Sequence, residues 1–157
     1  MNRIARIEID DAGRVPPSPE IEQERKVAIY DLLEDNSFTP APRGDQPPPD
    51  GPYALTLSIR DKRLVFEIAS EAGAPAGEFH LSLGPFRQVV KDYFQIWQAY
   101  YEAVTSLPPA QIESIDMAHR GIHNEGARVL MERLDGKAEI DLDTARRLFT
   151  LICVLWG

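Results

Sequence analysis

The chain contains a single cysteine, Cys153, among its 157 residues. One thiol cannot form a disulfide within the chain, and the disulfide frameworks of small secreted proteins need an even set of cysteines. Residues 1–4 also lack the apolar run that a secretory signal peptide needs. Both absences favour a protein of the reducing cytoplasm, with Cys153 as an unreactive part of the core.

Positive charge is scarce as well. The sequence has 17 Lys and Arg against 25 Asp and Glu, which gives a net charge of −8 at pH 7. A nucleic-acid binder needs a basic footprint to release counterions, and an anionic membrane surface attracts basic segments. We therefore predict neither nucleic acid nor a membrane as a partner, and we interpret the acidity as an aid to solubility.

Motifs that identify particular catalysts are also missing. The sequence has no glycine-rich phosphate loop, no pair of closely spaced cysteines and no nucleophile elbow. It has no internal repeat either, and we predict no cofactor. Whether the protein is an enzyme stays open on the sequence alone.

The chain does have a very apolar end, which runs from Leu148 to Trp156. This run is too short to cross a bilayer, because spanning one takes about 20 apolar residues. A short helix that is apolar on every side belongs in the centre of a core. A length of 157 residues fits one domain. We therefore predict a single globular domain over residues 1–157, built around a buried carboxy-terminal helix.

The spacing of apolar residues predicts three further helices, over residues 19–35, 85–104 and about 109–134. Each begins at a proline, which suits the first turn of a helix because no amide donor is needed there. Gly121 and Gly126 are expected to weaken or kink the third helix, and Gly136 to end it in a left-handed conformation. Asp141 or Asp143 is expected to cap the last helix.

Alternating apolar and polar residues predict strands over residues 3–9, 55–60, 64–68 and 79–83. The fold class is therefore α+β: a small, mostly antiparallel sheet covered by about four helices. The last helix should lie between the sheet and the helix over residues 85–104. Residues 36–52 hold six of the 13 prolines, and we predict that they form a mobile loop with neither helix nor ladder.

The helix over residues 85–104 carries a broad aromatic stripe. Aromatic residues at helical spacing usually belong to a core, but this stripe is wider than one helix face. An exposed part of it would mark a protein interface. Trp97, Tyr100 and Tyr101 are therefore candidate residues for binding a partner protein or a second copy in a homodimer.

The densest polar cluster runs from Asp116 to Gly126. His119 and His123 are four residues apart, the spacing at which two imidazoles on one helix face can chelate a metal ion, with Asp116 as a third ligand. The motif is incomplete, because Arg120 follows the first histidine where zinc proteases have a glutamate. His119 and His123 thus remain the metal candidates, and we predict no metal.

The same cluster also suits acid–base chemistry. His123 titrates near neutral pH, Glu125 or Asp116 could orient it, and Arg120 could hold an anionic substrate. These four are the candidate catalytic residues. The pattern favours a third interpretation, in which His123, Asn124 and Glu125 satisfy backbone groups at a helix kink between two glycines.

Arg146 and Arg147 lie near the start of the last helix, where a phosphate could bind. Asp141 and Asp143 would repel that phosphate, so we expect them to pair with the arginines instead. Exposed pairs of this kind contribute under about 1 kcal/mol each.

Several runs together resemble a known family. They are Glu24-Arg25 with residues 28–32, then residues 90–94, 123–126, 132–134 and 143–155. The chain is similar over nearly its full length to uncharacterised protein family two hundred and sixty-two, a set of short alphaproteobacterial proteins. The resemblance implies a bacterial cytoplasmic setting and no assigned activity, ligand or catalytic residue. It also implies that a basic residue often stands at the position of His119, and this departure argues further against a metal site at the two histidines.

These observations predict a small cytoplasmic interaction or regulatory protein without catalysis, whose binding surface is the aromatic helix. The alternative is a small-molecule binding protein or enzyme with a polar site around Asp116, Arg120, His123 and Glu125. A concave pocket on which these four side chains converge would favour the alternative.

Overall fold

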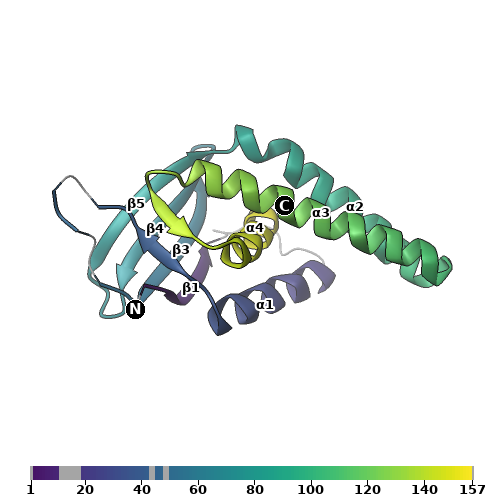
Figure 1. Ribbon diagram of the computed structural model, residues 1–157, viewed down its shortest axis with the longest axis horizontal. Helices are drawn as coiled ribbons and strands as arrows, with labels where there is room; N and C mark the ends of the chain where they lie inside the picture. Colours follow the sequence, from purple (N-terminus) through teal and green to yellow (C-terminus); the bar gives the residue numbers. More distant parts are fainter. Residues whose placement is uncertain (1, 11–18, 43–44, 48–49, 157) are drawn as a thin grey trace.

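The computed structural model describes residues 2–10, 19–42, 45–47 and 50–156, apart from the side chains of residues 103–105. In chain order the elements are β1 (Ile4–Asp10), α1 (Pro19–Glu34), β2 (Phe38–Pro40), β3 (Tyr53–Arg60), β4 (Arg63–Ser70), β5 (Pro75–Ser82), the 3-10 turn η1 (Gly84–Phe86), α2 (Arg87–Ser106), α3 (Pro109–Arg133), β6 (Ala138–Ile140) and α4 (Leu142–Trp156). The main sheet lies at one end of the molecule, and the four helices extend away from it (Figure 1). The α+β class predicted from the sequence is confirmed.

The main sheet has the strand order β1-β3-β4-β5. Its pairs are antiparallel except for β1, which runs parallel to β3 after a connection that includes α1. Asp61 and Lys62 join β3 to β4 with φ values of 52° and 62°, the left-handed pair that a tight hairpin turn needs. The sequence predicted the β3–β4 hairpin. It did not predict the parallel β1–β3 pairing, which joins segments far apart in the chain.

One face of the sheet carries the core. Leu55 pairs with Ile68 and Leu57 with Phe66, and all four side chains are buried. The opposite face is mostly polar around the buried Val65, and Arg60 reaches across it to Glu67 with an N···O distance of 2.6 Å. The sheet therefore has one wet face and one face that helices must cover.

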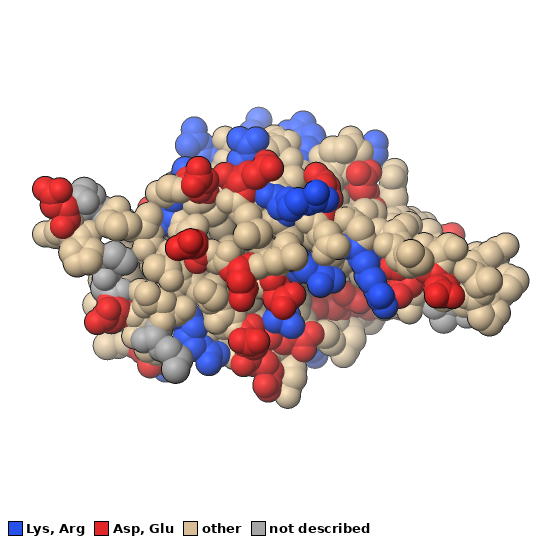
Figure 2. All heavy atoms as spheres, viewed as in Figure 1, with Lys and Arg blue, Asp and Glu red and all other residues tan. Residues whose placement is uncertain are grey.

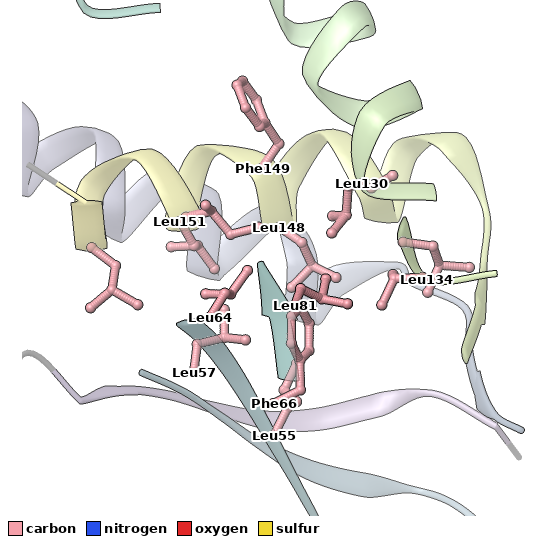
Figure 3. Close-up of a cluster of buried hydrophobic side chains, with 14 of the residues drawn as sticks. Leu55, Leu57, Leu64, Phe66, Leu81, Leu130, Leu134, Leu148, Phe149 and Leu151 are labelled. Carbon is pink, nitrogen blue, oxygen red and sulfur yellow. The ribbon is translucent and has the colours of Figure 1, made fainter. Parts of the chain in front are cut away.

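Helix α4 covers that inner face. Leu148 and Leu151 point from α4 toward the sheet residues Leu57 and Leu64, while Phe149 points the opposite way (Figure 3). Residues 148–153 are all buried, as the apolar end of the sequence predicted. The expected neighbour was wrong in one respect, because α3 and α1 flank α4 more extensively than the aromatic helix α2 does.

The ends of α1 and α4 are fixed by specific hydrogen bonds. Asp141 caps α4, since its Oδ1 accepts a hydrogen bond from the Thr144 amide at 2.8 Å. Asn36 follows α1 and binds both backbone groups of Ile4, accepting from the amide at 2.7 Å and donating to the carbonyl at 2.9 Å. Arg147 donates to the carbonyl of Asp35 at 3.1 Å. These contacts position α1 against both the sheet and α4.

The expectation that residues 36–52 form no ladder was wrong for their first part. Phe38 to Pro40 form β2, which pairs antiparallel with β6, the short extended piece before α4. Phe38 is fully buried and precedes most of the prolines, so its apolar side chain outweighs the local breakers. Mobility of the rest stays a prediction, and residues 43–44 and 48–49 lie outside the described residues.

Gly126 has a packing role in place of the expected kink. Helix α3 is continuous through both glycines, from Pro109 to Arg133. A Cβ atom added at Gly126 would lie 2.4 Å from the Phe149 ring, whereas one at Gly121 would meet nothing within 4 Å. Gly126 therefore lets α3 approach α4 closely, and the effect of Gly121 is confined to helix propensity.

Helices α2 and α3 form a hairpin whose outer end projects past α1 and α4 (Figure 1). The connection over residues 106–111 has no charged residue. The corresponding end of the surface is mostly uncharged in the same view (Figure 2). Among the described residues, no helix is both long enough and apolar enough to cross a membrane.

Candidate functional site

Two histidines on α3 face inward, toward α4. His119 and His123 lie one turn apart, so their side chains share one helix face. Their Nε2 atoms are 3.2 Å apart, and the two rings are inclined at 63°. The other ring nitrogen of His123, Nδ1, lies 3.3 Å from the Thr150 hydroxyl on α4.

Thr150 determines how protons can be arranged along this chain. Its hydroxyl lies 3.2 Å from the carbonyl of Arg146 one turn earlier, to which it can donate its single proton. In that arrangement His123 Nδ1 carries a proton and donates it to the Thr150 oxygen. His123 Nε2 is then an acceptor that faces His119. The tautomer assigned in this way leaves a nitrogen lone pair between the two rings.

Aromatic rings from α2 form a wall beside the histidines. The Tyr93 ring lies 5.4 Å from that of His123 and 6.0 Å from that of His119, measured between centroids. Tyr100 stacks against His119 at 6.4 Å with an angle of 28°. Tyr93 is buried, and burial raises its pKa above the usual range, so its hydroxyl stays neutral.

A hollow of about 270 Å³ opens over the histidines, between α1, α3 and α4. We call it the histidine hollow. It is lined by Glu24, Val27, Ala28, Asp31, His119, His123, Asp143, Arg146, Arg147 and Thr150. Three carboxylates and two guanidiniums thus surround it, a formal balance of −1.

Burial controls the charge of these groups. Burial, with smaller contributions from the nearby His119 and Arg146, lowers the pKa of His123 to about 4. Burial also lowers the pKa of His119, against the opposing effect of Asp116. Glu24 is partly desolvated, which raises its pKa. At neutral pH the hollow therefore contains two neutral imidazoles, the form in which histidine binds metals or accepts protons.

The four residues predicted as a polar site do not converge. Asp116 pairs with Arg120 at 3.1 Å, and Glu125 pairs with Arg128 at 2.7 Å, both on the exposed side of α3. Only His123 of the four lines the histidine hollow. The structure does bring the two metal candidates, His119 and His123, together.

The aromatic candidates lie closer to the histidines than the sequence indicated. Trp97 and Tyr101 pack together with ring centroids 4.2 Å apart, and Tyr100 contacts both Tyr101 and His119. Trp97 and Tyr100 are half-buried, while Tyr101 is 39% exposed. Most of the aromatic stripe therefore packs between the helices, and of the three candidates Tyr101 is the exposed one.

Thr150 and Glu24 were missed by the sequence reasoning. Thr150 is a polar residue inside an otherwise apolar run, which is a signal that it has a buried partner. Glu24 appeared in the sequence only as part of a run that carries the family resemblance, and nothing marked it as a site residue. Its place in the hollow depends on how α1 docks.

A larger hollow of about 380 Å³ lies beside β2 and β6. Its lining consists mainly of prolines, short side chains and the turn around Gly136, whose φ is 78°. It brings together no pair of titratable rings. The chemistry therefore favours the smaller histidine hollow as the candidate site.

The histidines should make folding stability depend on pH. The pKa of His123 in the folded chain, about 4, lies below the value of 6.5 that is usual for a solvent-exposed histidine, so the unfolded chain binds the proton more readily. We expect the free energy of unfolding to be greatest above pH 6.5 and to fall as the pH drops toward 4. A shift of this size corresponds to at most about 3 kcal/mol. Urea unfolding at several pH values, with a chelator present, measures it.

His123→Gln should flatten this pH dependence, because it removes the group that titrates differently in the two states. His80→Gln is the matched control, since His80 is exposed on the sheet beside Glu78. Equal slopes between pH 6.5 and 4 for the wild type and His123→Gln would contradict the assignment.

Comparison with known proteins places the chain in a family. The model of the Uncharacterised protein family (UPF0262) matches residues 1–157. A UPF0262 protein of Cereibacter sphaeroides is 71% identical over 158 residues, covering 100% of both chains. One of Ruegeria pomeroyi is 72% identical over 155 residues, covering 99% of this chain and 96% of the relative. One of Paracoccus denitrificans is 70% identical over 154 residues, with 98% and 95% covered.

No solved structure matches the chain. The names of these relatives state no activity, ligand or partner. The resemblance noted in the sequence is confirmed over the whole length: the chain belongs to the Uncharacterised protein family (UPF0262).

Proposed function

We propose that this protein binds a small polar ligand in the histidine hollow and does not catalyse a reaction there. The observation that carries the proposal is the pair of neutral imidazoles, 3.2 Å apart, beside an open hollow. His119 and His123 are partly desolvated and have Thr150 as a further buried partner. Keeping such a polar pair between helices costs folding free energy unless its hydrogen-bonding groups are used.

The size of the hollow limits the ligand. Sites for drug-sized molecules are about 300–1,000 Å³, so a volume of about 270 Å³ fits an ion or a molecule smaller than a typical drug. Binding without catalysis is supported by the placement of the candidate catalytic groups. Glu125 and Asp116 pair with arginines on the exposed side of α3, so neither orients His123 as an acid–base partner would.

Nuclear magnetic resonance of the imidazole nitrogens tests this proposal. Inorganic phosphate, acetate and zinc chloride are added separately to the full chain at pH 7. We expect at least one of them to shift the His119 and His123 ring signals in a saturable manner. The His80 signals provide an internal control and should stay in place. If none of the three probes moves the hollow's signals, the proposal is wrong.

The projecting end of the α2–α3 hairpin supports a second candidate, the protein–protein interaction predicted from the aromatic helix. Three large hydrophobic residues are exposed on this hairpin: Tyr101 at 39%, Leu107 at 40% and Met117 at 65%. A second copy of the chain would cover them. Sedimentation velocity at increasing concentration should then show a dimer that Leu107→Glu weakens. A strict monomer at every concentration counts against it.

The cytoplasm is part of the same proposal. A single buried cysteine suits a reducing compartment, and burial raises the pKa of the Cys153 thiol, which keeps it unreactive.

A further inference from the structure

We propose that the histidine hollow binds one divalent transition-metal ion, with His119 Nε2 and His123 Nε2 as its protein ligands. This inference rests on the proposed function, because it names the ligand class of the same hollow.

The distance between the two nitrogens fits a shared metal ion. Two nitrogen ligands on tetrahedral zinc, with bonds of about 2.0–2.1 Å, lie about 3.3 Å apart. The observed Nε2–Nε2 distance is 3.2 Å. The helix backbone fixes the four-residue spacing, so this pair needs little rearrangement to bind an ion.

The surroundings of His123 match those of a metal-bound imidazole. A histidine ligand usually donates its other ring proton to an oxygen, which fixes the ring and its tautomer. Here the Thr150 hydroxyl lies 3.3 Å from His123 Nδ1, and Thr150 itself is buried on α4. Tyr93 packs edge-on against the same ring at 5.4 Å and restricts its rotation.

The charges around the hollow are nearly balanced. The lining contains the carboxylates of Glu24, Asp31 and Asp143 and the guanidiniums of Arg146 and Arg147. Arg146 lies 3.9 Å from Asp143, and Arg147 donates to the Asp35 carbonyl. Arg146 also lowers the pKa of both histidines and so opposes a cation there, which means that the two imidazole lone pairs, and not the charge of the lining, would hold the ion.

The coordination would be open. Among the described residues, no group of three or more His, Cys, Asp or Glu side chains is placed to hold a metal ion. The two imidazoles therefore leave positions for water or a small exogenous ligand, and the hollow gives solvent access to them. Imidazole ligands select zinc, nickel or copper over magnesium and calcium, which prefer oxygen.

The proton count of binding is simple. A direct hydrogen bond between the rings places one proton between the two Nε2 atoms. Metal binding requires that proton to move to His119 Nδ1, and no net proton is released from two neutral imidazoles. Both imidazoles then present their Nε2 lone pairs to the ion.

Calorimetric titration of the untagged full chain with zinc chloride at pH 7.5 tests the inference. We expect saturable binding of one ion per chain, and similar binding of nickel. Magnesium chloride in excess should not compete. His119→Gln and His123→Gln should each weaken binding by more than the about 10- to 100-fold that loss of an outer hydrogen-bond partner costs.

Two further variants separate a metal site from a general structural effect. Thr150→Val should weaken zinc binding about 10-fold. Thr150→Ser should bind zinc as tightly as the wild type does, since serine keeps the hydroxyl. His80→Gln removes the third histidine and should leave the affinity unchanged. If His123→Gln fails to fold, the less buried His119→Gln still decides the question.

The outcomes distinguish the two proposals. No saturable zinc binding, or equal loss in His80→Gln and His119→Gln, overturns the metal site. If zinc fails while phosphate or acetate shifts the His119 and His123 resonances, the ligand-binding proposal survives without the metal. If no probe binds, both proposals are wrong.

Discussion

Removal of the last ten residues is expected to abolish cooperative folding. The deleted segment carries six apolar side chains that are at most 2% exposed: Leu148, Phe149, Leu151, Ile152, Cys153 and Leu155. Truncating one large buried side chain costs about 2–5 kcal/mol. Losing this set exceeds the about 5–15 kcal/mol that stabilises a typical domain. Calorimetry and near-ultraviolet circular dichroism should show no unfolding transition.

Single substitutions in α4 test its role in the core with smaller expected losses of stability. Phe149→Ala should lower the free energy of unfolding by about 3–5 kcal/mol, because its ring is fully buried between α3 and α4. Leu142→Ala is a control on the same helix. Leu142 is 46% exposed, so its loss should cost no more than about 0.5 kcal/mol. If the truncated chain melts at the wild-type temperature, α4 is not the centre of the hydrophobic core and the prediction is wrong.

Gly126→Val is expected to cost about 3 kcal/mol or more. Even a Cβ atom there would lie 2.4 Å from the Phe149 ring, well inside van der Waals contact. That ring is fully buried and has no free volume to enter, so α3 and α4 must separate or the ring must leave its rotamer. Urea denaturation, followed by tryptophan fluorescence, measures the loss.

Gly121→Val is the matched control for this prediction. It lies on the same helix with no atom within 4 Å of the added Cβ, so we expect a change within about 0.5 kcal/mol. Combining Gly126→Val with Phe149→Leu should cost less than the sum of the two single changes, because the smaller side chain relieves the overlap. Equal losses at positions 121 and 126 would show that propensity, rather than contact, sets the effect.

The local elements were predictable because their signals are local. Pro19 and Pro109 begin α1 and α3 as expected, Asp61 and Lys62 form the hairpin turn, and Asp141 caps α4. What failed were the distant pairings. The parallel β1–β3 pair and the β2–β6 ladder join segments far apart in the chain, and no periodicity within a segment specifies its partner.

The candidate site was half visible in the sequence for a similar reason. Helical spacing placed His119 and His123 on one face, but it could not decide which polar residues share that face with a neighbouring helix. Asp116 and Glu125 find local arginines instead, because i,i+3 and i,i+4 partners are always within reach. Thr150 and Glu24 line the hollow together with the histidines only because α4 and α1 dock against α3.

The absence of a Cβ atom at Gly126 also affects the contact between Thr150 and His123. His123 lies one turn before Gly126 on α3, and Thr150 is the next residue after Phe149 on α4. The spacing that the glycine permits between the two helices is thus the spacing that lets a threonine oxygen touch an imidazole. A larger residue at this one position would pull the hydroxyl out of range and misalign the ring without changing any polar atom. The packing of Phe149 and the polar contact of Thr150 with His123 therefore both depend on a single backbone position.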